Sequence, residues 1–477
     1  MADSGSTSAC RARGRPCSLP SDPAPIDVGL LSPVTVGSAD AVSDAAVLDA
    51  LVTAEAALAR AWGEVAAAPA DAVAGISGAL GWSGPGQLCI GHGADLGALA
   101  EAAVAGGNPV IPLVSALRAR VAPEHRAWVH RGATSQDILD SALMLVARRA
   151  CTDVSAALER AEAALTALAR THRGTVAAAR TLGQHAVPTT FGLRAATWLA
   201  GVRRAGVRLE AAASTLPAQL GGAAGTLAAA VEAAGHALGD EAARDAAVRL
   251  PTLLAAELGL AAPDAPWHTV RWPVTELGDA LVQVMDAAGV VAADVVTLSR
   301  TEIAEVSEGA AGGSSAMPQK QNPAASVLIR SAAIRAPHLG ASLHASAALA
   351  VDERPDGAWH AEWPVLRELL RLALGTAATL ARLVDGLVID ADAMARNTAA
   401  SGGLIVAERL SAVAAPLVGP DRLAAIIARA NGGDDLRGLL ASESALAGLD
   451  LDELLDPAHY TGLAGILTDR LTGDTRA

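Results

Sequence analysis

Residues 275–308 read TELGDALVQVMDAAGVVAADVVTLSRTEIAEVSE, and this stretch decides the fold of the chain. Its apolar residues alternate spacings of four and three, at Leu277, Leu281, Val284, Ala288, Val291, Val295 and Leu298. Such a pattern is typical of a long helix packed nearly parallel to its neighbours. One helix over the whole stretch would be about 50 Å long at the usual rise per residue.

The same pattern occurs twice more, which predicts a bundle. It appears at Val154, Leu158, Ala161, Leu165 and Leu168, and again at Phe191, Ala195, Trp198, Val202, Ala205 and Leu209. Residues 45–64 predict an amphipathic helix, residues 81–93 a loop interrupted by Gly and Pro, and Asn108-Pro109 the start of another helix. The fold class is therefore predicted to be all-α, with long central helices.

Four divisions of the chain are expected from these patterns. Residues 1–26, rich in Ser, Pro and Arg, predict a disordered tail. A smaller N-terminal helical domain is expected over 27–118, the central bundle over 119–365, and a smaller C-terminal helical domain over 366–477. A single subunit is not expected to bury the apolar stripes of all these helices, so an oligomer is expected.

The composition favours helices and argues against several classes of protein. Hydrophobic residues make up 52% of the chain but include one Phe and one Tyr, so Ala, Leu and Val dominate; Ala and Leu are strong helix formers. A formal net charge of −14 argues against non-specific nucleic-acid binding. The four cysteines lack metal-ligand spacing, and a disulfide scaffold is not expected in a chain of this size, so a reducing cytosol is expected. Charged residues interrupt the apolar runs, so no membrane span or signal sequence is expected.

The chain contains one lysine, Lys320, within GSSAMPQKQNP at residues 313–323. Arg is a broad planar fork and Lys a compact point charge, so a site that keeps Lys needs a small cation in a tight space. Survival of one surface lysine by chance is the alternative. Lys320 and Asn322 supply donors with no acidic residue in the run, which predicts a pocket for a carboxylate.

This run resembles the GSSxMPxKxN signature of the fumarase/aspartase superfamily. Two further segments support the resemblance, HRGATSQD at 130–137 and TLGQHAVPTTFG at 181–192. The resemblance extends roughly from residue 27 to the C-terminus. Residues 359–363 (WHAEW) and 455–460 (LDPAHY) are similar to the 3-carboxy-cis,cis-muconate cycloisomerase branch in particular.

The resemblance implies a role for each matching residue. Ser314 would be the catalytic base, abstracting a proton from the carbon next to a carboxylate, and Lys320 would stabilise its alkoxide. The substrate-binding residues would be Thr134, Ser135, Gln136, Asn322, His130, Arg131, Gln184, Met317 and Arg354. His185 is a candidate for the general acid. For Ser314 the alternative is a helix cap, and for His130, His185 and Arg354 an ordinary structural or surface role.

Two departures from the superfamily pattern bear on the reaction. The relatives that eliminate amines or water carry a His where this chain has Leu182, and a Glu where it has Val327. A basic leaving group needs a proton in the transition state, whereas a stable anion needs none. The paired loss therefore predicts a leaving group, or in reverse an attacking group, that is already a stable anion.

Two reactions meet this requirement. The first is lactonisation of 3-carboxy-cis,cis-muconate, and the alternative is a carbon–nitrogen lyase that expels nitrite from nitrosuccinate and leaves fumarate. An adenylosuccinate lyase or an inactive structural homologue is less favoured. In either case the substrate is a small di- or tricarboxylate, no cofactor or metal is expected, and the resemblance implies a homotetramer whose active sites are shared between subunits.

Overall fold

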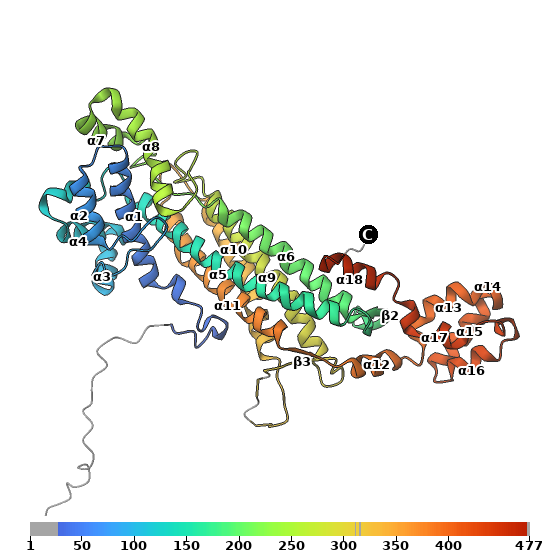
Figure 1. The fold of residues 1–477 in the computed structure, drawn as a ribbon. Coiled ribbons are helices and arrows are strands. Elements are labelled where there is room, and N and C mark those ends of the chain that lie inside the picture. The colour runs from blue at the N-terminus through green and yellow to red at the C-terminus, as the bar shows by residue number, and fades with distance from the viewer. Residues whose placement is uncertain (1–26, 311, 314–315, 475–477) are drawn as a thin grey trace, which may run out of the picture.

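A computed structural model describes residues 27–310, 312–313 and 316–474 of the chain. The molecule is elongated, with a bundle of long helices between a helical unit at its N-terminal end and another at its C-terminal end (Figure 1). The bundle consists of α5 (Ser135–Thr171), α6 (Phe191–Ser214), α9 (Trp272–Leu298), α10 (Ala324–Ala348) and α11 (Ala358–Asp385). The sequence prediction of an all-α fold with long central helices is confirmed.

The predicted seams form the interior of this bundle. Leu277, Leu281 and Val291 of α9 are buried, as are the corresponding residues of α5 and α6 such as Leu165 and Val202. α9 packs against α6, α10 and α11, and α5 packs against α6 and α11. Small side chains allow the helices to approach closely. The interior can then be packed to the crystal-like density that is usual in proteins.

The helix expected over 275–308 is shorter than predicted. It begins at Trp272 and ends at Leu298, and Val306–Glu308 form the short strand β3, which pairs with β4 (Leu387–Ile389). The alternating pattern ends at Leu298, so the residues beyond it have no seam to extend. A second antiparallel pair, β1 (Val176–Thr181) and β2 (Gln184–Thr190), forms a hairpin after α5. Leu182 and Gly183 both have positive φ at its turn, as a tight hairpin requires.

The N-terminal unit packs on one end of the bundle and was largely predicted. Its helices are α1 (Asp44–Glu64), α2 (Ala70–Leu80), α3 (Leu96–Gly106) and α4 (Val110–Arg120), and α7 (Ala228–Leu238) and α8 (Asp240–Leu258) lie beside them (Figure 1). The predicted helix over 45–64, the loop over 81–93 and the helix start at Asn108-Pro109 match these bounds within a residue or two.

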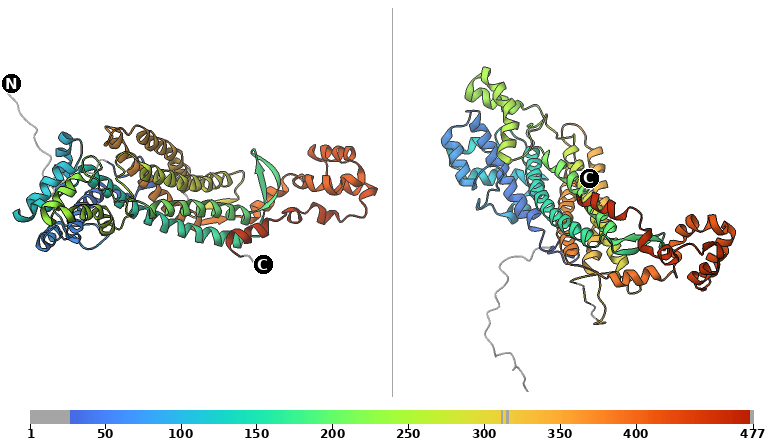
Figure 2. Two further views of the ribbon diagram at one scale, coloured as in Figure 1. Left: turned by 90° about the horizontal axis from the view of Figure 1, so that it is seen from above. Right: turned by 45° about the vertical axis from the view of Figure 1, so that its right-hand side comes forward.

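The C-terminal unit projects from the other end of the bundle and has a core of its own, separate from the bundle core (Figure 2). It contains α12 (Ala391–Ala399), α13 (Ala407–Val413), α14 (Ala415–Val418), α15 (Pro420–Asn431), α16 (Leu436–Ala441) and α17 (Leu451–Leu455), whereas α18 (Ala464–Thr472) returns to pack on α6. The expected boundary at 365/366 lies inside α11, so the structure moves the start of this unit beyond Asp385.

The apolar helix α9 is long enough to cross a membrane by length and composition, although the sequence predicted no such segment. It lies within the bundle, where α6, α10 and α11 pack against it. A single buried core helix commonly meets the same criteria, so this observation is weak evidence for a membrane span.

Candidate active site

The helix α5 separates two groups of candidate residues. Thr134 is the residue before its first turn, and the β1–β2 hairpin follows its last turn. Thirty-seven residues of helix correspond to about 55 Å. The segment 130–137 and the hairpin with Gln184 and His185 therefore lie at opposite ends of the bundle (Figure 1).

Asp137 organises the end of the bundle that carries Thr134. Its buried carboxylate accepts hydrogen bonds from the backbone N–H groups of Thr134, Gly221 and Gly222, each at 2.9 Å. Nε2 of His268 lies 2.7 Å from the same carboxylate. A carboxylate that accepts several hydrogen bonds fixes the loops that supply the donors.

Arg354 joins this end of the bundle from a distant part of the sequence. It lies in the exposed loop between α10 and α11, and its guanidinium donates a hydrogen bond to the hydroxyl of Thr134. The structure thus brings together two residues, 220 positions apart, that the sequence had predicted separately as carboxylate ligands. Ser135 is half-buried beside them at the first turn of α5.

His130 and Arg131 precede Thr134 and contact α1 and the loop before α5. His130 has a φ of 62°, and its Nδ1 lies 2.7 Å from Oε1 of the buried Glu55. The backbone carbonyl of Arg131 accepts a hydrogen bond from the indole of Trp62. The guanidinium of Arg131 stacks over the ring of Trp128, and its buried Nε donates no hydrogen bond to any described residue.

Gln136 was predicted to bind substrate, but the structure places it in the core. The residue is completely buried, and its amide donates hydrogen bonds to Asp140 and to the carbonyl of His268. Gln136 points into the core at the first turn of α5, whereas Thr134 and Ser135 are only partly buried at the end of the helix. Its position therefore favours support of the site over direct contact with substrate.

A buried ionic cluster lies beneath Gln136. Arg271 forms paired hydrogen bonds with Asp140 on one side and Glu362 on the other, and Trp359 also donates to Asp140. Burial alone would lower the pKa of Arg271, but the two carboxylates raise it above its usual value. Burial raises the pKa of Glu362 more than Arg271 lowers it. This cluster ties α5, α9 and α11 together directly behind the Thr134 loop.

The signature run lies at the opposite end of the bundle, between β3 and α10. Its base is closed by two backbone hydrogen bonds between Gly312 and Asn322, and the side-chain amide of Asn322 donates to the carbonyl of Gly313. The buried carboxylate of Glu308 accepts hydrogen bonds from the N–H groups of Ala325 and Ser326 and so caps α10. Negative charge at a helix N-terminus is stabilising, so Glu308 helps to fix the start of α10.

Lys320 and Met317 are both exposed on this segment, and the N–H of Lys320 donates to the carbonyl of Met317. Ser314, the predicted base, and its neighbour Ser315 lie outside the described residues. Lys320 is thus presented to solvent in the single chain, two positions before Asn322. Its predicted role stays a prediction.

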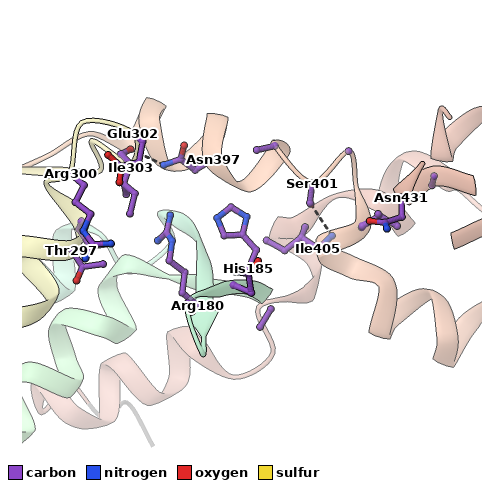
Figure 3. Close-up of a pocket in the computed structure, with 18 of the residues that line it drawn as sticks. Arg180, His185, Thr297, Arg300, Glu302, Ile303, Asn397, Ser401, Ile405 and Asn431 are labelled. Atoms are coloured by element: carbon purple, nitrogen blue, oxygen red, sulfur yellow. Dashed lines mark hydrogen bonds between the residues drawn. The ribbon is translucent and has the colours of Figure 1, made fainter. Parts of the chain in front are cut away.

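The hairpin opens onto a cavity of about 1240 Å³ at this same end. Gln184 and His185 line it, and Arg180 and His185 project into the space between the end of α9 and the residues of α12 to α15 (Figure 3). Arg180 is neutralised by paired hydrogen bonds to Glu305. Arg194 also lines the cavity, and burial lowers its pKa, although Asp294 and Glu305 oppose that effect.

One chain does not bring all the predicted residues together. Thr134 contacts the loop that follows α10, whereas Lys320 lies just before α10 begins. The 25 residues of α10 place about 37 Å between these two points. The described residues therefore form two separate half-sites in one chain: the hydroxyls of Thr134 and Ser135 at one end, and the exposed cation of Lys320 at the other.

Several supporting residues were not predicted from sequence: Glu55, Asp137, His268, Arg271 and Glu362. The adjacent glycines Gly221 and Gly222 were a usable signal, because paired glycines mark a close approach of backbone. The buried charges gave no local signal, since their partners lie far apart in the sequence.

The fold and the site are those of a helical-bundle lyase, and the comparisons with known proteins identify its family. The lyase family matches residues 108–337, and the chain belongs to this family of the fumarase/aspartase superfamily and is an enzyme of that group.

Three relatives show the range of the similarity. The chain is 48% identical to a nitrosuccinate lyase of Streptomyces davaonensis, an alignment that covers 94% of this chain and 95% of the relative. It is 40% identical to a 3-carboxy-cis,cis-muconate cycloisomerase of Pseudomonas aeruginosa, covering 91% and 93%. The crystal structure of the 3-carboxy-cis,cis-muconate lactonizing enzyme of Pseudomonas putida superposes with a TM-score of 0.83 at 34% identity, covering 94% and 98%.

Proposed function

We propose that this lyase is a cofactor-free β-eliminating enzyme whose leaving group is a stable anion, with nitrosuccinate as its substrate. The observation that carries the proposal is the pair of aliphatic residues at the positions of the acid pair. Leu182 is fully exposed at the turn of the hairpin, and Val327 is 52% exposed on α10. Neither side chain can donate a proton to a leaving group.

The proposed reaction balances without such a donor. The Ser314 alkoxide removes a proton from the carbon next to one carboxylate of nitrosuccinate, and the electron pair of that C–H bond forms the new double bond. The carbon–nitrogen bond breaks, and its electron pair leaves with nitrite. Lys320 stabilises the alkoxide before proton transfer, because a compact cation close to an oxyanion lowers its energy. Fumarate and nitrite are the products.

The choice of substrate rests on similarity, and it reverses the order suggested by the sequence alone. The nitrosuccinate lyase relative is 48% identical, against 40% for the muconate cycloisomerase, at similar coverage. Lactonisation remains the second candidate, because the muconate enzymes also share the fold and align over nearly the whole chain. It uses the same residues for addition of a carboxylate oxygen to a double bond.

A shared active site is part of the proposal. Thr134 and Arg354 would come from one subunit and Lys320 and Ser314 from another, in a homotetramer built on the bundle. Exposed apolar side chains on the bundle helices support this assembly, among them Val290 of α9 and Val327 and Ile334 of α10. Where such side chains form a contiguous patch, the patch is typical of a subunit contact.

The proposal is tested by offering the purified enzyme each substrate in turn. We expect nitrosuccinate to give fumarate and nitrite in equal amounts, measured by fumarate absorbance and a colorimetric nitrite assay. Formation of a muconolactone from 3-carboxy-cis,cis-muconate, without nitrite release from nitrosuccinate, would favour the second candidate. Rapid cleavage of adenylosuccinate or dehydration of malate would contradict the argument from the missing acid pair.

A further inference from the structure

Glu55 pairs with His130, and neither the signature segments nor the leaving-group argument gives Glu55 a role. Glu55 lies in the middle of α1, and its side chain is completely buried, whereas 17% of the His130 side chain is exposed. Oε1 of Glu55 lies 2.7 Å from Nδ1 of His130, and Oε2 accepts no hydrogen bond from any described residue. A buried carboxylate is costly unless it is paired, so this contact is its main compensation.

The backbone of His130 is held in an unusual conformation that directs its ring toward Glu55. Its φ of 62° lies in the left-handed region, which residues other than glycine seldom adopt. Strain of this kind persists where surrounding structure imposes it and concentrates at functional sites. Four residues farther on, Thr134 receives the hydrogen bond from Arg354. The ring is thus fixed beside the loop that carries the predicted carboxylate ligands.

Nδ1 is occupied by Glu55, and Nε2 of His130 makes no hydrogen bond with the described residues. Charged groups face the ring from three helices: Glu55 of α1, Asp137 of α5 and Arg118 of α4. Burial lowers the pKa of His130, and so does Arg118. The charge and hydrogen bond of Glu55, together with the charge of Asp137, outweigh these effects, so the pKa is raised above its usual value. The net direction favours the imidazolium, with a second N–H available to an anion.

We propose that Glu55 is a positioning residue that holds His130 as a cation, with Nε2–H directed at an anionic oxygen of the substrate. This inference rests on the proposed function and adds a specific role to it. The His–Glu acid pair of the relatives is missing, so it cannot protonate the leaving group. The fixed imidazolium of His130 stabilises negative charge on the substrate without giving up its proton. The oxygen that accepts this hydrogen bond belongs to a carboxylate of the substrate or to the departing nitrite.

The test is the pH dependence of kcat/KM in wild type and in Glu55→Gln. Gln preserves size and hydrogen bonding but removes the charge. In wild type, activity is expected to fall as pH rises through the raised pKa of His130. Loss of a charge at this distance lowers a histidine pKa by about one unit or more, so the alkaline limb of Glu55→Gln moves down by about that amount. At a pH above the wild-type limb, kcat/KM of Glu55→Gln is about tenfold lower than that of wild type, whereas at a pH below both limbs it stays close to wild type.

The chain offers a matched control on the same helix. Asp49 of α1 lies 2.9 Å from Nε2 of His92, a pair remote from Thr134. Asp49→Asn removes a carboxylate–histidine pair without touching the site, and we expect its pH profile to match wild type. A uniform loss of activity at all pH values in Glu55→Gln, or a profile that superimposes on wild type, overturns the proposal.

A second measurement needs no substrate and so separates this inference from the proposed function. Trypsin releases residues 127–131 (AWVHR), which contain His130 and no other histidine. Diethyl pyrocarbonate modifies neutral imidazole, so labelling of this peptide against pH, read by mass spectrometry, reports the pKa of His130. We expect half-maximal labelling above pH 6.5 in wild type and at lower pH in Glu55→Gln. Equal midpoints contradict the inference even if nitrosuccinate is turned over, whereas a shifted midpoint without turnover contradicts the proposed function alone.

Discussion

The two ends of the bundle differ in how far one chain completes them. At the Thr134 end, Asp137 has four hydrogen-bonding partners, and Arg271 lies between two buried carboxylates. At the other end, Lys320 is exposed and Leu182 protrudes fully from the hairpin turn. The first end is preorganised by its own chain, and the second presents reactive groups outward.

The two ends differ in how firmly one chain holds their side chains. A substrate loop held by buried charges keeps its hydroxyl and N–H donors in place before binding, which avoids reorganisation during the reaction. By contrast, residues 316–321 of the signature segment are exposed to solvent. The following experiments would break or sharpen the contrast between the two ends.

The largest effect is expected at the exposed end. Ser314→Ala should reduce kcat by about 10⁴-fold or more, because the proposed base is lost. Binding of fumarate, measured by calorimetry, should persist, since the Thr134 end is unchanged. Retention of normal turnover in Ser314→Ala would remove the basis of the proposed mechanism.

Lys320→Arg tests whether this end needs a compact cation. The charge is kept, but the broad guanidinium does not fit a site shaped for an ammonium, so we expect kcat to fall about 10²-fold. Steady-state kinetics with nitrosuccinate provide the measurement. Near-normal activity would show that position 320 requires only positive charge, as an ordinary surface residue does.

Mixing two inactive variants tests whether the two ends meet across subunits. Ser314→Ala damages one end and Thr134→Ala the other. After the mixture is unfolded and refolded together, about a quarter of the shared sites should carry both wild-type residues and regain activity. Each variant refolded alone is the control. Absence of regained activity, with mixed oligomers verified by mass spectrometry, would place the two half-sites in separate active sites.

The buried charges should matter far more for stability than exposed ones. Arg271→Met leaves Asp140 and Glu362 buried without their counter-ion, so the free energy of unfolding should fall by about 3–5 kcal/mol. The matched control is Arg437→Met in the C-terminal unit, where Arg437 and Asp452 form a paired contact but are 54% and 77% exposed. That variant should lose about 1 kcal/mol or less. Denaturant unfolding followed by circular dichroism compares the two.

The smallest effect is expected at the hairpin turn. Leu182→Ala removes a fully exposed side chain, so thermal stability of the isolated chain should hardly change. Nitrite release should also stay within about threefold of wild type, because Leu182 donates no proton in the proposed reaction. A large loss of activity with unchanged stability would show that this side chain packs against the substrate or a neighbouring subunit.

Much of the fold could be predicted because helix patterns are local. The seams at Leu277–Leu298, Val154–Leu168 and Phe191–Leu209 depend on residues three and four positions apart, and the structure buries them, apart from Leu168, which is partly buried. The end of α9 was misjudged: the apolar pattern does stop at Leu298, but the strand β3 that follows is fixed by its pairing with β4, which lies far away in the sequence. The expected domain boundary at 365/366 was also misplaced, because α11 continues across it and packs on the bundle.

The sequence alone determined the family, the three signature segments and the absence of an acid pair at Leu182 and Val327. These follow from residue identity and spacing. The tertiary structure alone decided that Arg354 meets Thr134, that Glu55 holds His130, and that Lys320 lies a helix length away from both. Such contacts join residues 75 to 220 positions apart. Their geometry is set by how long helices pack side by side, which no local pattern specifies.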